Sequence, residues 1–117
     1  MKSGHVDFGK QGEEQAREFL VKKGYKILDA NFSTKIGELD LIASKDGLLV
    51  IVEVKRRKNA RHGYPREAVH LHKQRQIIRL TQWYIQKHQL HHMQVRFDVI
   101  EILDDVMHHI ENAFYAG

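Results

Sequence analysis

The sequence contains no cysteine, and its only proline is Pro65. Without cysteine the chain forms neither disulfides nor thiolate metal sites, and a reducing compartment suits it. No apolar run approaches the roughly 18–20 residues needed to cross a bilayer, and the N-terminal segment lacks the apolar core of a signal peptide. We therefore expect a soluble, cytoplasmic protein that does not insert into a membrane.

A length of 117 residues is enough for one hydrophobic core. The sequence shows no repeat, low-complexity stretch or interdomain linker, so residues 1–117 are expected to form a single domain. Nineteen Lys and Arg against fifteen Asp and Glu give a formal net charge of +4. The excess is small, but five cations fall within residues 55–61, and this clustering predicts a surface that receives a polyanion.

Hydrophobic periodicity predicts an α/β fold in which a mixed sheet is flanked by helices. The predicted helices and strands, in the order α-β-β-β-α-β, cover residues 9–23, 25–32, 37–44, 48–56, 66–89 and 94–103. Residues 108–114 are expected to add either a short edge strand or a terminal cap, and residues 57–65 an exposed loop. Gly24 is expected to end the first helix, because glycine tolerates the left-handed conformation common after a helix.

Two acidic residues, Asp40 and Glu53, lie on the two arms of one predicted β-hairpin. Asp46-Gly47 between the arms is typical of a two-residue turn whose residues both tolerate positive φ. If these residues form the turn, Asp40 faces Glu53 directly, with Cβ atoms roughly 4.5–5.5 Å apart. Two carboxylates that close repel each other unless a proton or a cation joins them. The hairpin therefore predicts a divalent-metal site.

The predicted cofactor is Mg²⁺ or Mn²⁺, because such ions take hard oxygen ligands. Asp40, Glu53 and the main-chain carbonyl of Val54 would supply these ligands. Glu13 lies on the side of the first helix that faces the sheet, from which it would reach the cluster directly or through water. Lys55 shares a strand face with Glu53 and would orient a water and stabilise charge on phosphoryl oxygens. The four catalytic candidates are thus Glu13, Asp40, Glu53 and Lys55.

A structural alternative remains open, in which Lys55 pairs with Glu38 opposite it and Asp40 lies at a wet sheet edge. Glu53, however, interrupts an apolar central strand, where an unpaired charge costs on the order of several kcal/mol. A purely structural sequence would more often place Val or Ile there. We therefore favour a functional interpretation of the cluster.

A second set of candidates would contact nucleic-acid phosphates through positive charge. Its members are Arg56, Arg57, Lys58, Arg61, Lys73, Gln74 and Arg75. The alternative for each is a solvated surface. Nine histidines do not indicate zinc, because no convergent set of ligands stands out.

Four further residues are interpreted from their position alone. Trp83 and Tyr84 are expected to pack in the core rather than to stack on a base. Arg96 and Asp98 share one strand face, and they either pair with each other or support the cluster.

Asp40 followed by Glu53-Val54-Lys55 resembles the core motif of the PD-(D/E)XK nuclease superfamily, with Leu39 in place of its nominal proline. Longer segments resemble the YraN family of uncharacterised bacterial proteins over nearly the whole chain. They are G-x-x-GE-x-x-A at 9–16, GY at 24–25, GELDLIA at 37–43, VEVKRR at 52–57, the stretch 63–68, Lys73, RFDV at 96–99 and HIENAF at 109–114.

The YraN family is similar in fold to archaeal Holliday-junction resolvases, so the resemblance implies a restriction-endonuclease-like core. It also implies a metal-dependent endonuclease for DNA, with branched or otherwise structured DNA as the candidate substrate. The resolvase helix glutamate, strand aspartate and E-x-K set correspond to Glu13, Asp40, Glu53 and Lys55. Those resolvases act as dimers, so a homodimer is also expected.

Two alternatives to the enzyme remain. One is a nucleic-acid-binding module with a nuclease fold and no turnover, and the other is a scaffold whose basic surface meets an acidic protein.

Overall fold

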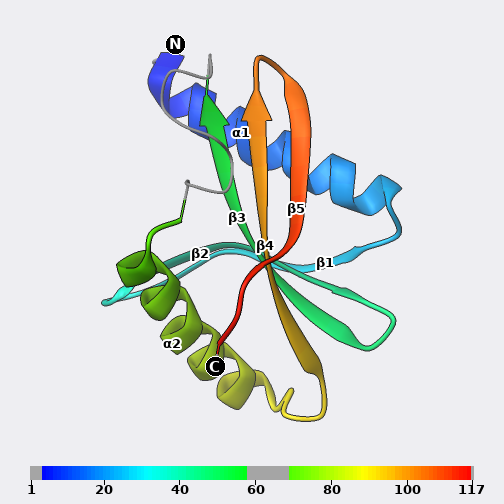
Figure 1. Ribbon diagram of the computed structural model, residues 1–117, viewed down its shortest axis with the longest axis vertical. Helices are drawn as coiled ribbons and strands as arrows, with labels where there is room; N and C mark the ends of the chain where they lie inside the picture. Colours follow the sequence, from blue (N-terminus) through cyan, green and yellow to red (C-terminus); the bar gives the residue numbers. More distant parts are fainter. Residues whose placement is uncertain (1–3, 58–68, 117) are drawn as a thin grey trace.

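The computed structural model describes residues 4–57 and 69–116. Its elements are α1 (Gly4–Lys22), β1 (Lys26–Thr34), β2 (Gly37–Lys45), β3 (Leu48–Arg57), α2 (Leu71–His88), β4 (Gln94–Leu103) and β5 (Val106–Phe114). The predicted α/β class and the order of its first six elements are confirmed. Residues 108–114 belong to an added strand rather than a cap, and the arrangement is consistent with a nuclease-like fold (Figure 1).

The strands form one mixed sheet in the order β1-β2-β3-β4-β5. All neighbouring strands are antiparallel except β3 and β4, which are parallel. A parallel pair needs a crossover connection, and α2 lies in the connection between these two strands. The central position of β3 explains its apolar run, because both of its faces are covered.

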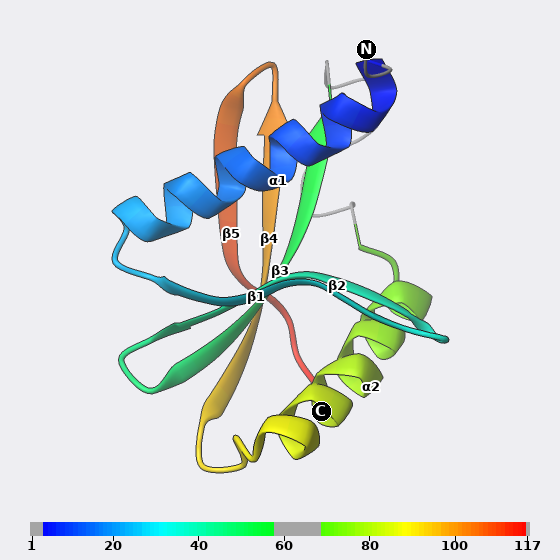
Figure 2. The ribbon, with the colours of Figure 1, turned by 180° about the vertical axis from the view of Figure 1, so that it is seen from behind.

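Two apolar clusters fill the space between the sheet and the helices, which lie on opposite faces of the sheet (Figure 2). Ala16 and Leu20 of α1 pack in one cluster with Val50 and Val52, whereas Ile51 packs in the other, beneath α2. This alternation along β3 agrees with the prediction that Glu53 and Lys55 share one strand face. It directs the side chains at the next odd positions, 53 and 55, to the α2 face of the sheet.

The predicted helix boundaries were partly wrong at the N-terminal ends. α1 begins at Gly4 rather than Gly9, because a glycine inside a helix costs only about 1 kcal/mol. α2 begins at Leu71 rather than at residue 66, since His70 is still extended, with φ −80° and ψ 164°. Gly24 ends α1 as predicted, with φ 94°. The predicted loop at 57–65 lies largely outside the described residues.

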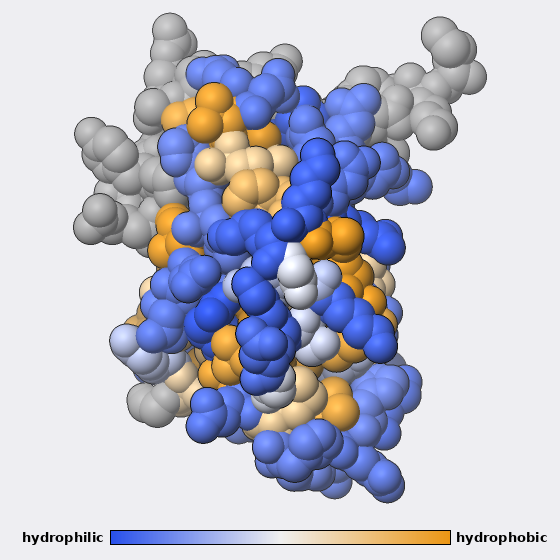
Figure 3. All heavy atoms as spheres, turned by 90° about the vertical axis from the view of Figure 1, so that its right-hand side faces the viewer, coloured by the Kyte–Doolittle hydropathy of each residue, from blue (hydrophilic) through white to orange (hydrophobic). Residues whose placement is uncertain are grey.

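Trp83 is 63% exposed, so the prediction that it packs in the core was wrong. The buried stripe of α2 consists of Ile77, Leu80, Thr81 and Tyr84, and Trp83 lies beside that stripe. Figure 3 shows one side of the molecule, where hydrophobic side chains form small patches between hydrophilic ones. In the described part of the chain, neither helix has the length and apolar character needed to span a membrane.

Candidate active site

The β2–β3 hairpin has the predicted register. Asp46 and Gly47 form its turn with φ values of 52° and 80°, as a two-residue primed turn requires. Paired residues then continue along the two strands as far as Leu41 and Val52. The turn therefore fixes which residues of β2 and β3 come together.

Beyond that pair the ladder stops, and the two strands form a fork. The N–H of Val54 donates to Asp40 Oδ2 at 2.9 Å. In a continued ladder this N–H would donate to a main-chain carbonyl of β2, so the Asp40 carboxylate replaces that carbonyl as the acceptor. The predicted direct cross-strand pairs, Asp40 with Glu53 and Glu38 with Lys55, are therefore not part of the ladder. The strands separate at the point where the candidate site begins.

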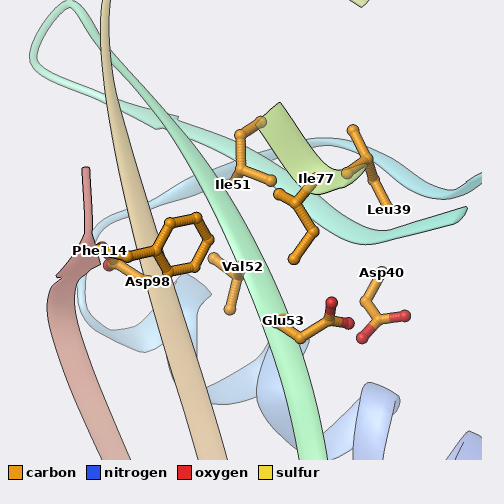
Figure 4. Close-up of a pocket in the computed structure, with 8 residues that line it drawn as sticks. All are labelled: Leu39, Asp40, Ile51, Val52, Glu53, Ile77, Asp98 and Phe114. Atoms are coloured by element: carbon orange, nitrogen blue, oxygen red, sulfur yellow. The ribbon is translucent and has the colours of Figure 1, made fainter. Parts of the chain in front are cut away.

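The carboxyl groups of Asp40 and Glu53 nevertheless meet in this fork, where Figure 4 shows them directed toward each other. Glu53 is only 6% exposed, and a hydrogen bond links its carboxyl group to that of Asp40. Burial, this hydrogen bond and the negative charge of Asp40 raise the pKa of Glu53 to about 9, while Lys73 and Lys55 partly oppose the rise. At neutral pH a proton therefore joins the two groups unless a cation replaces it.

Two lysines approach the pair on the α2 face of the sheet. Lys73 Nζ of α2 lies 3.8 Å from Glu53 Oε2, although Lys73 was predicted only as a phosphate contact. Lys55 is half-buried and forms no ion pair with any residue of the described ranges 4–57 and 69–116. Glu38 instead accepts a hydrogen bond from Ser33 Oγ at 3.1 Å. The structural alternative, a Glu38–Lys55 ion pair, is therefore not found.

Glu13 approaches the pair from α1, where Asn31 holds it. Glu13 Oε1 accepts a hydrogen bond from Asn31 Nδ2 at 2.8 Å. The pKa of Glu13 is raised above its ordinary value. Burial is the main cause, the hydrogen bond from Asn31 opposes the rise, and the negative charges of Asp40 and Glu38 add to it. Among the described residues, no three His, Cys, Asp or Glu side chains lie close enough to hold a metal ion together. Glu13 thus lies beside the carboxyl pair rather than within it.

The contact made by Asn31 was not anticipated from the sequence. Asn31 lies opposite Asp40 on β1, between the pairs Ala30–Leu41 and Phe32–Leu39, and has a left-handed φ of 55°. One feature of the sequence indicated an irregular backbone here: Asn31 lies within a predicted strand, although asparagine is depleted from strands and tolerates the left-handed conformation.

Arg56 and Arg57, predicted to contact phosphates, both contact acidic residues of the protein. Arg56 Nη2 lies 3.2 Å from Asp105 Oδ1, and Arg57 Nε lies 3.4 Å from Glu101 Oε2. Their binding to nucleic acid stays a prediction.

The other predicted phosphate contacts lie in two places. Lys58 and Arg61 fall outside the described residues. On α2, Gln74 Nε2 donates to the carbonyl of Val69 at 3.1 Å, whereas Arg75 is exposed to solvent. Lys73 and Arg75 thus place two positive charges on α2, on the same side of the sheet as Glu53 and Lys55.

Of the two alternatives for Arg96 and Asp98, the structure shows that they pair with each other. Arg96 Nε and Nη2 each lie 2.8 Å from an oxygen of Asp98, which also contacts His109 Nε2 at 2.7 Å and accepts from the N–H of Asn112 at 3.0 Å. Burial would raise the pKa of Asp98, but these hydrogen bonds together lower it. Asp98 lines the same narrow pocket as Asp40, although its oxygens are already engaged.

The donor atoms of the carboxyl pair fit Mg²⁺ or Mn²⁺. Both donors are hard oxygens, and Mg²⁺ is commonly held by one or two carboxylates while it keeps several waters. The raised pKa of Glu53 means that its carboxyl group keeps a proton beside Asp40 at neutral pH, so positive charge is stabilised at this position. A cation bound there would replace that proton.

A model of the uncharacterised protein family UPF0102 matches residues 12–102 of the chain. Several curated relatives that match most of the chain carry the name UPF0102 protein, among them the following three. The protein from Persephonella marina is 44% identical over 106 residues, which cover 91% of each chain. That from Syntrophotalea carbinolica is 47% identical over 97 residues, covering 83% of this chain and 79% of the relative. That from Clostridium beijerinckii is 43% identical over 120 residues, covering 97% and 98% respectively.

Proposed function

The chain belongs to the uncharacterised protein family UPF0102, the YraN family that its motifs indicated, and we propose that it is a metal-dependent endonuclease. The proposed reaction is hydrolysis of phosphodiester bonds in DNA, with branched or otherwise structured DNA as the substrate. The contact between the carboxyl groups of Asp40 and Glu53 carries the proposal. Holding a buried Glu53 against a half-buried Asp40 opposes folding, and a bound cation would offset this cost.

Asp40 and Glu53 would hold the metal ion. The Val54 carbonyl is a candidate third ligand, because the N–H and C=O of one strand residue point to the same edge and Asp40 already contacts that N–H. When bound, the ion would polarise a phosphoryl oxygen and acidify a water molecule.

Other side chains would act on the phosphate and on water. The Lys55 ammonium would donate to a phosphoryl oxygen and stabilise the negative charge that develops there during hydrolysis. Glu13, fixed by Asn31, would accept a hydrogen bond from a water and orient it. Lys73 would compensate the charge of Glu53 once that carboxyl group loses its proton.

The proposal is tested by nuclease assays on branched, single-stranded and duplex DNA and on RNA, with Mg²⁺, Mn²⁺ or EDTA. The wild type should cleave a DNA substrate only with metal. Asp40→Ala and Lys55→Ala should each lower the rate by roughly 100-fold or more, as expected for groups that act on the developing charge. Glu14→Ala and Lys26→Ala, at exposed positions, are charge-matched controls that should cleave like the wild type.

Wild-type cleavage by both the Asp40 and the Lys55 variant would refute the assignment. Binding of DNA that survives EDTA, without cleavage of any substrate, would favour the binding module instead. Circular dichroism of each variant would verify that the fold persists.

A further inference from the structure

A groove of about 720 Å³ lies between α2 and the tip of the β1–β2 hairpin. Figures 1 and 2 both show this tip beside α2, and Gln76 Nε2 holds it there by donating to the carbonyl of Ile36. Residues of the tip and of the outer side of α2 line the groove, including Lys35, Ile36, Arg79, Gln82, Trp83 and Gln86. The proposed catalytic residues are not among those that line it.

The groove presents an aromatic ring to solvent. Trp83 is 63% exposed and Ile36 is 42% exposed, although large apolar side chains are usually buried. Among the described residues, Trp83 has no aromatic partner. Its ring is therefore free to stack on a planar ligand.

The groove also carries positive charge without compensation. Lys35 and Arg79 line it, and in the part of the chain that the structure describes neither one forms an ion pair. None of its described lining residues is acidic. The groove thus combines a free aromatic face with two free cations.

This combination matches an unpaired segment of nucleic acid, whose bases stack on aromatic rings while its phosphates attract cations. It does not match a second copy of the chain. In a two-fold symmetric contact centred on this groove, Lys35 and Arg79 would meet the same cations of the other copy, and like charges across an interface are unfavourable.

We propose that this groove binds unpaired nucleotides, with a base on Trp83 and Ile36 and the flanking phosphates near Lys35 and Arg79. Ile36 lies in the turn before β2 and Asp40 lies four residues further along the chain, at most roughly 13 Å away if the segment is extended. A strand held in the groove therefore lies near the carboxyl pair. Binding is independent of the proposed nuclease activity, and only delivery of that strand for cleavage rests on it.

Trp83 is the only tryptophan in the chain, so its fluorescence reports directly on the groove. The test titrates the full chain in EDTA with ten-nucleotide oligo-dT, oligo-U and a blunt DNA duplex. The proposal expects saturable quenching by oligo-dT or oligo-U, and weaker quenching by the duplex. Comparison of the two single strands shows which sugar is preferred.

Variants separate the groove from general charge. Fluorescence anisotropy of a labelled single strand should show that Trp83→Ala lowers the affinity about 10-fold or more. Trp83→Phe should recover part of this loss. Arg79→Ala should also weaken binding. Lys22→Ala removes one exposed charge from α1, on the opposite face of the sheet, and should bind like the wild type. Asp40→Ala should bind normally even when cleavage is lost, which separates failure of the groove from failure of the nuclease proposal.

Wild-type affinity in Trp83→Ala would overturn the proposal, as would equal binding of duplex and single strand. A Trp83 signal that depends only on protein concentration, together with a dimer in sedimentation, would assign the groove to self-association and also overturn it.

Discussion

The Asp40 carboxylate has two kinds of neighbour. Its Oδ2 accepts the main-chain N–H of Val54, which anchors it to the edge of β3, and it also shares a hydrogen bond with Glu53. The first contact places the group, and the second gives Glu53 its raised pKa. A single aspartate therefore both opens the fork between the strands and makes half of the candidate metal site.

At the residue scale, Glu53→Gln is expected to reduce the dependence of stability on pH in metal-free protein. The pKa of Glu53 is about 9 in the folded chain, against an ordinary value of 4.5. The folded state thus holds the proton more tightly, so this contribution to stability is complete below pH 4.5 and is lost as the pH rises through about 9. Calorimetric melting in EDTA should show the melting temperature of the variant rising relative to that of the wild type between pH 4.5 and about 9.

Glu14→Gln changes an exposed carboxylate of α1 and is the matched control, whose melting temperature should follow the wild type. Parallel curves for Glu53→Gln and the wild type would contradict the shared proton.

At the scale of elements, the turn of the β2–β3 hairpin sets the register that brings Asp40 beside Glu53. Gly47 has a φ of 80°, and a Cβ added there would meet no atom within 4 Å. Gly47→Val should therefore cost about 1–2 kcal/mol of unfolding free energy through backbone strain alone, without a clash. Urea denaturation would measure this loss.

Gly47→Asn is the matched control for the turn and should lose less, because asparagine tolerates the left-handed conformation. Equal stability of the Val and Asn variants would show that the turn does not constrain the hairpin.

Most of the hairpin could be predicted from the sequence, because the Asp46-Gly47 turn and the alternation of β3 agree on one register. The fork could not, since it depends on a side chain that replaces a main-chain acceptor at Val54. The prediction that Trp83 is buried failed because hydrophobic periodicity does not separate a large apolar residue within a buried stripe from one beside it. The start of α2 had no side-chain cap to mark it.

At the scale of the whole molecule, the buried Asp98 network connects the segment between α1 and β1 to the last two strands. Arg96 and Asp98 lie on β4, His109 and Asn112 lie on β5, and Arg96 also contacts the hydroxyl group of Tyr25. Asp98 lines the same pocket as Asp40 and Glu53, but Arg96, His109 and Asn112 engage its oxygens, so we assign the network to stability.

Asp98→Asn is expected to lower the unfolding free energy by about 3–5 kcal/mol, because it removes the buried carboxylate with which Arg96 pairs and leaves that arginine its exposed acidic partner, Glu111. Hydrogen bonds lower the pKa of Asp98 below its ordinary 3.8 despite burial. Its contribution is therefore present above pH 3.8 and is lost as the pH falls through the lowered value. Urea denaturation between neutral and acidic pH should show this loss in the wild type but not in the variant.

Glu111→Gln alters the exposed partner of Arg96, 3.7 Å away, and should cost only about 0–1 kcal/mol. A comparable loss in both variants would show that burial of Asp98 does not set its importance.

The most direct measurement of the central claim is anomalous X-ray diffraction from crystals of the wild type and of Asp40→Asn soaked in Mn²⁺. We predict a manganese peak between the carboxylates of Asp40 and Glu53 in the wild type, and its loss in the variant. No peak at this pair under saturating Mn²⁺, or an equal peak in the Asn variant, would contradict the assignment of these two residues as metal ligands.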